Sequence, residues 1–263
     1  MEINGKTLRK ISTADCEIIG RGAIGTVYRL DDETIVKVYE ESVSPETIEC
    51  ERISARAAFV SGLPCAITFD TVDADGKIGV VYELFNAKTL ASVVMNDMRN
   101  VNKYAADLAE IAKRMHTTKA AVVGSVKELW LDWCGSVSGK VPEAEIAEMK
   151  AVISTVPDSD TFVHGDLHPK NVMVQSGEYL LIDMGDVGYG NPAFDLAVID
   201  TCLNVSAKFM PPEVVMSAYG MTSEICAQFY NAFRSAYGGD SALWDNVGKL
   251  SKVRHRLWNA INR

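Results

Sequence analysis

The pattern of apolar residues changes near residue 86, and this change limits the possible folds more than any other feature. Before it, one helix is predicted: Ser44 and Pro45 suit its first positions, and Gly62 and Pro64 indicate an end near Ser61. Short β-branched and aromatic runs surround this helix and are separated by turn residues. They predict five strands, at 16–19, 26–30, 34–38, 66–72 and 77–82.

After residue 86 the longer segments have helical periodicity. Residues 101–117 carry apolar side chains at three- and four-residue spacing, and residues 142–155 form a second helical segment that begins with a proline. Two short strands are expected at 172–174 and 179–182, and further helices after Asn191. The order predicts an α+β fold in two lobes: a small antiparallel sheet with one helix in residues 1–85, and a helical lobe in residues 86–263.

Composition and charge exclude several classes of protein. The chain of 263 residues has 26 Lys and Arg against 35 Asp and Glu, a net charge of −9, which argues against binding nucleic acid by broad phosphate neutralisation. It has no run of apolar residues long enough to span a membrane, and its first residues lack the apolar core of a signal peptide. The six cysteines are dispersed without a C-x-x-C pair, so we expect a reduced, cytoplasmic protein.

The segment GRGAIGTVY places Gly20, Gly22 and Gly25 in a G-x-G-x-x-G-x-V pattern. Dinucleotide-binding folds use the same spacing, but there a helix follows the glycines. Here the next residues are β-branched and aromatic, which predicts a strand–loop–strand whose backbone covers nucleotide phosphates. A simple hairpin turn is the alternative explanation.

Lys37 is a charged residue inside the apolar run Ile-Val-Lys-Val. Strand alternation places it on the face opposite Val36 and Val38. A solvated edge lysine is the common explanation, yet its position after the glycines matches that of a kinase lysine that reaches the phosphates. Such a lysine needs a carboxylate partner, and of Glu49 and Glu51 on the predicted helix we favour Glu51.

The stretch HGDLHPKN provides the strongest functional signal. Asp166 and Asn171 have the D-x-x-x-x-N spacing of a phosphoryl-transfer loop, in which the aspartate orients the attacking hydroxyl and the asparagine binds Mg²⁺. Asp183 follows at the end of a predicted strand, in the sequence Ile-Asp-Met-Gly. The oxygen atoms of Asn171 and Asp183 are the ligands that Mg²⁺ prefers.

With these motifs the chain resembles the aminoglycoside phosphotransferase and choline kinase family, whose members are related to protein kinases and phosphorylate small molecules. The resemblance covers essentially the whole chain and includes GNP followed by DLA at Asp195. It implies a protein-kinase-like fold and transfer of the γ-phosphoryl group of ATP or GTP to a hydroxyl of a small molecule. It also implies that backbone groups of Glu83 and Leu84 pair with the adenine. The acceptor is left open among aminoglycosides, amino alcohols, sugars and similar alcohols.

Three other classes of function are weighed against this hypothesis. A protein kinase would need a long activation segment, yet Asp195 follows Asp183 after only 12 residues. A regulatory module that binds nucleotide without turnover would share every motif. In a hydrolase, His164 and His168 with Asp166 would bind zinc, but no recognisable ligand motif completes that set.

Three further features have no assigned function. Trp130 and Trp133 would either fill the core of the helical lobe or present their faces to an amine or sugar acceptor. Lys170 stands where the family often has a small residue, and whether it contacts substrate or phosphate is left open. The basic residues near the C-terminus predict the solvated side of a final helix without a nucleic-acid function. They are Lys249, Lys252, Arg254, Arg256 and Arg263.

Overall fold

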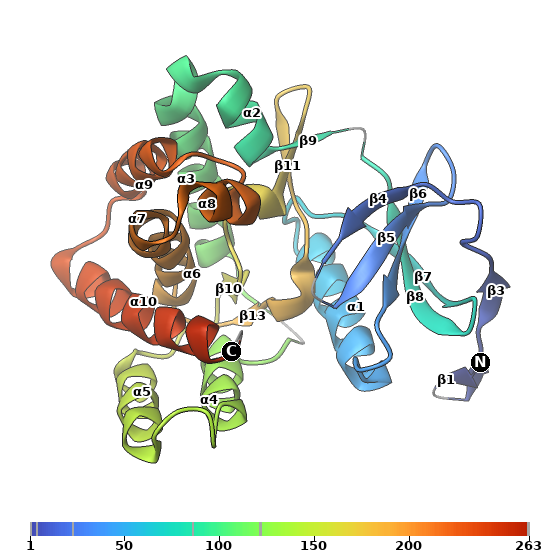
Figure 1. Cartoon of the computed structure of the whole chain (residues 1–263), viewed down its shortest axis with the longest axis horizontal. Helices are drawn as coiled ribbons and strands as arrows, with labels where there is room; N and C mark the ends of the chain where they lie inside the picture. The colour runs from blue at the N-terminus through green and yellow to red at the C-terminus, as the bar shows by residue number, and fades with distance from the viewer. Residues whose placement is uncertain (1, 4, 23, 86, 121–122, 262–263) are drawn as a thin grey trace.

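The computed structural model describes the whole chain except residues 1, 4, 23, 86, 121–122 and 262–263. Two lobes lie side by side (Figure 1). One is a sheet with a single long helix, and the other consists mainly of helices, as the sequence predicted.

The N-terminal lobe is a six-stranded sheet in the order β3-β7-β8-β6-β5-β4. The five predicted strands are present and pair antiparallel, although β4 and β7 each begin and end two residues later than expected. The sixth, β3, pairs parallel to β7 at the edge, and its exposed arginine and lysine give no alternating pattern from which to predict it. The strands are β3 (Arg9–Ile11), β4 (Ile18–Arg21), β5 (Gly25–Arg29), β6 (Thr34–Tyr39), β7 (Thr68–Ala74) and β8 (Lys77–Glu83). Ahead of them, β1 (Glu2–Ile3) pairs with β2 (Lys6–Thr7).

In this lobe the start of the helix agrees with the prediction, whereas the turn between β7 and β8 is shorter. Helix α1 (Pro45–Val60) begins after Ser44, whose side chain accepts a hydrogen bond from the Thr47 amide. The β7–β8 turn is tighter than expected, because only Asp75 and Gly76 leave the strands, at φ 52° and 90°. Two residues of positive φ match the twist of the flanking strands.

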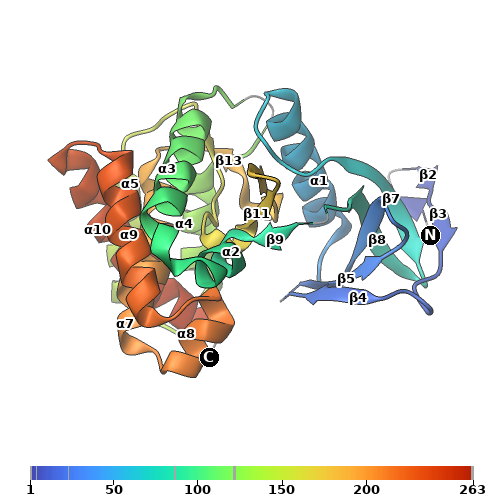
Figure 2. The same cartoon turned by 90° about the horizontal axis from the view of Figure 1, so that it is seen from above.

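The C-terminal lobe packs its helices around one large apolar core. Aromatic side chains from several elements fill its centre, and α3 lies alongside α9 (Figure 2). The helices are α2 (Leu90–Asn96), α3 (Val101–Thr117), α4 (Val126–Ser136), α5 (Glu143–Thr155), α6 (Ala193–Ile199), α7 (Ala207–Phe209), α8 (Pro212–Tyr219), α9 (Ser223–Tyr237) and α10 (Ser241–Ile261). Shorter turns are η1 (Met98–Asn100), η2 (Pro169–Asn171), η3 (Met184–Asp186) and the π-helical η4 (Asp200–Ser206).

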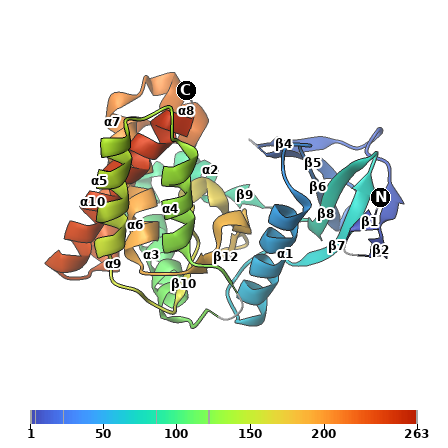
Figure 3. The same ribbon diagram turned by 90° about the horizontal axis from the view of Figure 1, so that it is seen from below.

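Two small sheets hold the segments that carry the motifs. Strands β9 (Lys88–Thr89), β11 (Val172–Gln175) and β12 (Glu178–Leu181) form one, and β10 (Phe162–Val163) pairs with β13 (Gly188–Tyr189) in the other. Helix α1 lies between the large sheet and these segments, and it packs on η3 (Figure 3). Helix α1 of the N-terminal lobe therefore contacts the segment that follows Asp183 in the other lobe. None of the described helices is long and apolar enough to cross a membrane.

Candidate active site

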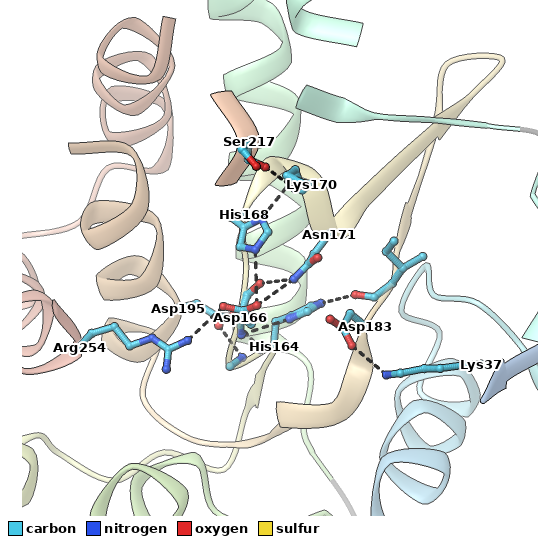
Figure 4. Close-up of polar contacts among 12 residues, drawn as sticks. Lys37, His164, Asp166, His168, Lys170, Asn171, Asp183, Asp195, Ser217 and Arg254 are labelled. Atoms are coloured by element: carbon cyan, nitrogen blue, oxygen red, sulfur yellow. Dashed lines mark hydrogen bonds and ion pairs between the residues drawn. The ribbon is translucent and has the colours of Figure 1, made fainter. Parts of the chain in front are cut away.

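The loop that carries the His-Gly-Asp motif connects β10 to η2, and its backbone bends at Gly165. This residue has φ +83°, and a Cβ atom there would collide with the carbonyl of Asp186. Only glycine satisfies both the positive φ and this close approach. The bend turns Asp166, the next residue, toward the rest of the site (Figure 4).

Asp195, at the start of α6, fixes the loop from behind. Its carboxylate accepts hydrogen bonds from the backbone amides of His164 and Gly165, both at 2.8 Å, and lies 2.9 Å from Nε2 of His116. The Asp195 side chain is fully buried. Sequence reasoning had matched Asp195 to the family without giving it a function, and the structure shows that it orders the loop that carries Asp166.

Asp166 is surrounded by donors. Asn171 Nδ2 donates to its Oδ2 at 3.1 Å and to its backbone carbonyl at 2.9 Å, while Arg254 Nη2 donates to its Oδ1 at 3.2 Å. His168 Nε2 lies 3.5 Å from Oδ2. Burial opposes ionisation, yet the hydrogen bond from His168 and the charge of Arg254 hold the pKa of Asp166 well below its usual value. The carboxylate is ionised at neutral pH and can orient a hydroxyl.

Lys37 forms two ion pairs, one with Glu51 in its own lobe and one with Asp183 in the other lobe. Its Nζ lies 2.8 Å from Oε1 of Glu51 on α1 and 3.3 Å from Oδ1 of Asp183 beyond β12. Burial lowers the pKa of Lys37, but the charges of Glu51 and Asp183 outweigh that effect and raise it overall. Tyr82 also donates to Glu51, at 3.2 Å, which holds the carboxylate toward the lysine. Glu51 is therefore the partner of Lys37 as predicted, whereas Glu49 pairs with Arg52.

The two residues predicted to bind Mg²⁺ present oxygen atoms on the same side of the loop (Figure 4). The amide nitrogen of Asn171 is committed to Asp166, so its Oδ1 remains for a cation. Asp183 has the left-handed conformation, φ 58° and ψ 63°, and its side chain is half exposed. An amide oxygen and a carboxylate fit Mg²⁺, which takes its other ligands from water and phosphate.

The glycines of the first motif differ in what they do. A Cβ on Gly25 would lie 2.6 Å from the carbonyl oxygen of Val38, so the strand pairing itself requires this glycine. Gly20 and Gly22 have no such close neighbour, and Gly22 donates to the Gly25 carbonyl at 2.9 Å. A strand follows Gly25 and not a helix, which agrees with the phosphate-covering loop and not with a dinucleotide site. Residue 23 in this loop lies outside the described residues.

The backbone amides of Glu83 and Leu84, two of the groups expected to contact the adenine, form hydrogen bonds within the protein. The amide of Glu83 donates to the Ile67 carbonyl at 3.1 Å, and that of Leu84 donates to the Glu33 carbonyl at 2.7 Å. Both N–H groups are therefore occupied within the protein, a tertiary pairing with no signal in the motif. Their carbonyl oxygens are the groups left to test as adenine partners.

The two histidines of the loop are occupied by structural hydrogen bonds. His164 is fully buried, its Nε2 lies 3.0 Å from the Ile182 carbonyl, and its Nδ1 accepts from the Asp166 amide. His168 Nδ1 accepts from the Lys170 amide at 3.2 Å. The zinc alternative loses support, because the His164 nitrogens are not free to bind a metal.

Lys170 turns away from Asp166. Its Nζ donates to the carbonyl of Ser217 on α8 at 3.1 Å (Figure 4). The side chain thus ties the loop to α8.

The prediction for the last helix is wrong at one position. Lys249, Lys252 and Arg256 are exposed as expected, and Arg263 lies outside the described residues. Arg254, however, has a side chain only 12% exposed and reaches Asp166. Helical spacing in the sequence could have indicated this burial, because Arg254 lies on the same face of α10 as the buried Leu250 and Leu257.

Trp130 and Trp133 lie on helix α4. Ser125 caps this helix by accepting from the Glu128 amide. Trp130 is fully buried and packs edge-on against Phe194, so it is a core residue. The guanidinium of Arg254 lies over the ring of Trp133, 4.7 Å from its centroid, and 5.8 Å from that of Trp130. The open aromatic face considered for an amine is therefore covered by Arg254.

This fold and site define a kinase-like phosphotransferase, and comparison with known proteins agrees. The sequence model described as the phosphotransferase enzyme family matches residues 15–247, which take in both lobes from the glycine motif to α10. The chain belongs to that family. No curated protein sequence matches the chain.

Solved structures share the fold at low sequence identity. A choline/ethanolamine kinase family protein from Mesorhizobium loti is 15% identical, covers 94% of this chain and 78% of its own, and has a TM-score of 0.64. An amicoumacin kinase in complex with AMP-PNP, Ca²⁺ and Ami is 16% identical, with 97% and 82% covered and a TM-score of 0.63. An aminoglycoside-3′-phosphotransferase of type VIII is 19% identical, with 91% and 93% covered and a TM-score of 0.60.

Proposed function

We propose that this protein transfers the γ-phosphoryl group of ATP or GTP to a hydroxyl group of a small molecule, with Mg²⁺ as cofactor. The observation that carries the proposal is the meeting of two charged sets in one site. The lysine pair, Lys37 with Glu51, comes from the N-terminal lobe and touches Asp183 of the other lobe. Asp166 and Asn171 lie in hydrogen-bond contact on the adjoining loop.

In this reaction Asp166 orients the acceptor. Its ionised carboxylate accepts the hydroxyl hydrogen, which directs the oxygen lone pair to the γ-phosphorus. A bond forms between that oxygen and phosphorus while the bond from phosphorus to the bridging oxygen breaks. The bridging oxygen keeps the electron pair in the departing nucleoside diphosphate, and the hydroxyl proton passes to Asp166 and then to solvent.

The remaining residues hold the donor. Lys37 binds phosphate oxygens, and Gly20, Gly22 and Gly25 bring the backbone of the strand–loop–strand over them. The carbonyl oxygens of Glu83 and Leu84 would accept hydrogen bonds from the base. Asn171 and Asp183 hold Mg²⁺, which when bound neutralises phosphate charge. Positioning and charge neutralisation supply most of the catalysis, because the transition state asks little covalent chemistry of the protein.

A protein substrate is less consistent with the chain. Between Asp183 and Asp195 the residues form η3, β13 and the start of α6, and leave no long activation segment. The complexes of related structures contain small molecules, such as the kanamycin complex of one aminoglycoside phosphotransferase. A small hydroxylated acceptor is the simpler proposal.

The test is release of nucleoside diphosphate with Mg-ATP and Mg-GTP across aminoglycosides, amino alcohols, sugars, hydroxy acids and nucleosides. We expect one acceptor class to stimulate release and Asp166→Asn to lower that rate by about 10²–10⁴-fold while nucleotide affinity persists. Asp160→Asn is the matched control, since Asp160 is exposed and pairs only with Lys119 among the described residues.

Two results would contradict the proposal. Near-normal turnover in Asp166→Asn would remove this residue from the reaction. Nucleotide binding without release for any acceptor would favour the regulatory module instead.

A further inference from the structure

Arg254 is a feature of the site that the proposed reaction does not use. It lies on α10, beyond the span 15–247 matched by the family model, and reaches back to the catalytic aspartate. Its side chain is 12% exposed, so a largely buried positive charge lies beside Asp166.

The guanidinium is fixed on two sides. Nη2 donates to Asp166 Oδ1 at 3.2 Å, and the guanidinium carbon lies 4.7 Å from the centroid of the Trp133 ring. Stacking on an indole sets the plane of the guanidinium and limits its rotamers. Among the residues that the structure describes, Asp166 is the only hydrogen-bond acceptor of Arg254. Its other N–H groups are therefore available to a ligand.

This arrangement removes both attractions that a cationic acceptor would use. The aromatic face of Trp133 is covered, and one oxygen of Asp166 is already paired with a permanent positive charge. An ammonium group beside the reactive hydroxyl would then face a like charge. A planar guanidinium with free N–H groups is instead suited to a carboxylate or phosphate, which it can bind through two parallel hydrogen bonds.

We propose that Arg254 selects an acceptor that carries a carboxylate or phosphate group next to the hydroxyl that is phosphorylated. The proposal rests on the proposed function, because it describes the acceptor of that same site. The anionic group lies against the free edge of the guanidinium, and the hydroxyl lies on Asp166. Arg254 thereby makes a negatively charged acceptor acceptable beside an aspartate and excludes amino alcohols and polycationic sugars.

The test is a set of binding titrations followed by tryptophan fluorescence, since Trp133 contacts Arg254. The protein is saturated with Mg²⁺ and a non-hydrolysable ATP analogue. The four probes are glycerate, glycerol phosphate, glycerol and aminopropanediol, which are matched in carbon skeleton and differ in charge. We expect at least one anion to bind about tenfold or more tightly than the cation, and the stronger of the two anions distinguishes carboxylate from phosphate.

Variants separate the charge of Arg254 from its contribution to folding. Arg254→Gln should abolish the preference for anions, and Arg254→Lys should keep it in weaker form, because lysine retains the charge without the planar fork. Arg256→Gln is the control, since Arg256 lies on the same helix, is exposed and pairs with Glu148. It should bind as the wild type does.

The outcomes distinguish a failure of the inference about Arg254 from a failure of the proposed phosphotransfer. Equal or tighter binding of aminopropanediol by the wild type, no saturable binding of either anion, or an unchanged preference in Arg254→Gln would each overturn the inference and leave the proposed phosphotransfer intact. Failure of the wild type to bind the Mg-nucleotide analogue would instead contradict the proposed function, and the inference with it.

Discussion

At the scale of single residues, backbone conformation places the side chains of the candidate site. Gly165 and Asp183 both have positive φ, at 83° and 58°, and each stands at or beside a residue that the proposed reaction uses. Such backbone conformations cost free energy, so they persist only where the surrounding structure enforces them. For Gly165 that surrounding contact is the carbonyl of Asp186.

Replacing Gly165 with alanine should therefore disrupt both stability and the site. We expect a loss of about 3 kcal/mol or more in the free energy of unfolding, because the variant has both a strained φ and a steric collision. Gly177→Ala is the matched control: its φ is +85°, but nothing lies within 4 Å of a Cβ there. It should lose only about 1–2 kcal/mol, measured by urea denaturation. Equal losses in the two variants would show that the collision is unimportant.

Asp186 gives a prediction for pH. Burial, and then the charge of Asp166, raise the pKa of Asp186 to about 7 in the folded protein. A raised carboxyl pKa means that the folded state holds its proton more tightly than the unfolded state, so this group lowers stability as pH rises from about 4 to 7.

The variant Asp186→Asn removes that titration. Relative to wild type, its free energy of unfolding should be equal near pH 3.5 and higher by on the order of 4 kcal/mol at pH 8, with the gain developing between about pH 4 and 7. Denaturation at a series of pH values measures it. A difference independent of pH would contradict the raised pKa.

At the scale of elements, helix α1 supplies the carboxylate that holds Lys37. The Glu51 side chain is 4% exposed and that of Lys37 is 15% exposed, so their pair is far better shielded than a surface ion pair. Helix α10 acts in the same manner on the other side, since it delivers Arg254 to Asp166. Each lobe thus contributes one helix that orients a charged residue of the site.

Glu51→Gln should weaken the orientation of Lys37. We expect kcat/KM for the nucleotide to fall by about tenfold or more, because a buried charge-assisted hydrogen bond is lost. Glu49→Gln on the same helix affects an ion pair with Arg52 outside the site and should stay close to wild type. Steady-state kinetics, with the acceptor that the nucleoside diphosphate release assay identifies, measures both variants. Similar losses in the two variants would argue that α1 acts through stability alone.

At the scale of the whole molecule, the site exists only where the lobes meet. Lys37 lies on β6 in one lobe, and Asp183 follows β12 in the other, yet their charged atoms are 3.3 Å apart. Binding of a Mg-nucleotide between these groups would stabilise the two-lobed arrangement, because a ligand that binds only the folded state raises its stability.

Asp183→Ala should remove the Mg²⁺ dependence of that stabilisation. In the wild type, nucleotide affinity measured by calorimetry should be tighter with Mg²⁺ than with EDTA by about 1.4 kcal/mol or more. In Asp183→Ala the two values should agree, because one of the two proposed metal ligands is missing. A retained Mg²⁺ effect in the variant would exclude Asp183 as a ligand.

Much of this protein is determined by its sequence alone. Local rules act over a few residues, so strand alternation placed Lys37 opposite Val36, and the cap at Ser44 started α1. The spacing from Asp166 to Asn171 predicted the chemistry of the loop, because one short segment can place an acceptor-orienting carboxylate beside a metal-binding amide.

Only the tertiary structure decided which distant residues complete the site. Arg254 is 88 residues from Asp166. Its sequence neighbours predict a solvated side chain, but the packing of α10 buries it beside Asp166. The edge strand β3, with two exposed basic residues, likewise forms because β7 is there to pair with it. Local patterns cannot contain such information, since a helix face or a strand edge is defined by the neighbour that covers it, and that neighbour is chosen by the packing of the whole chain.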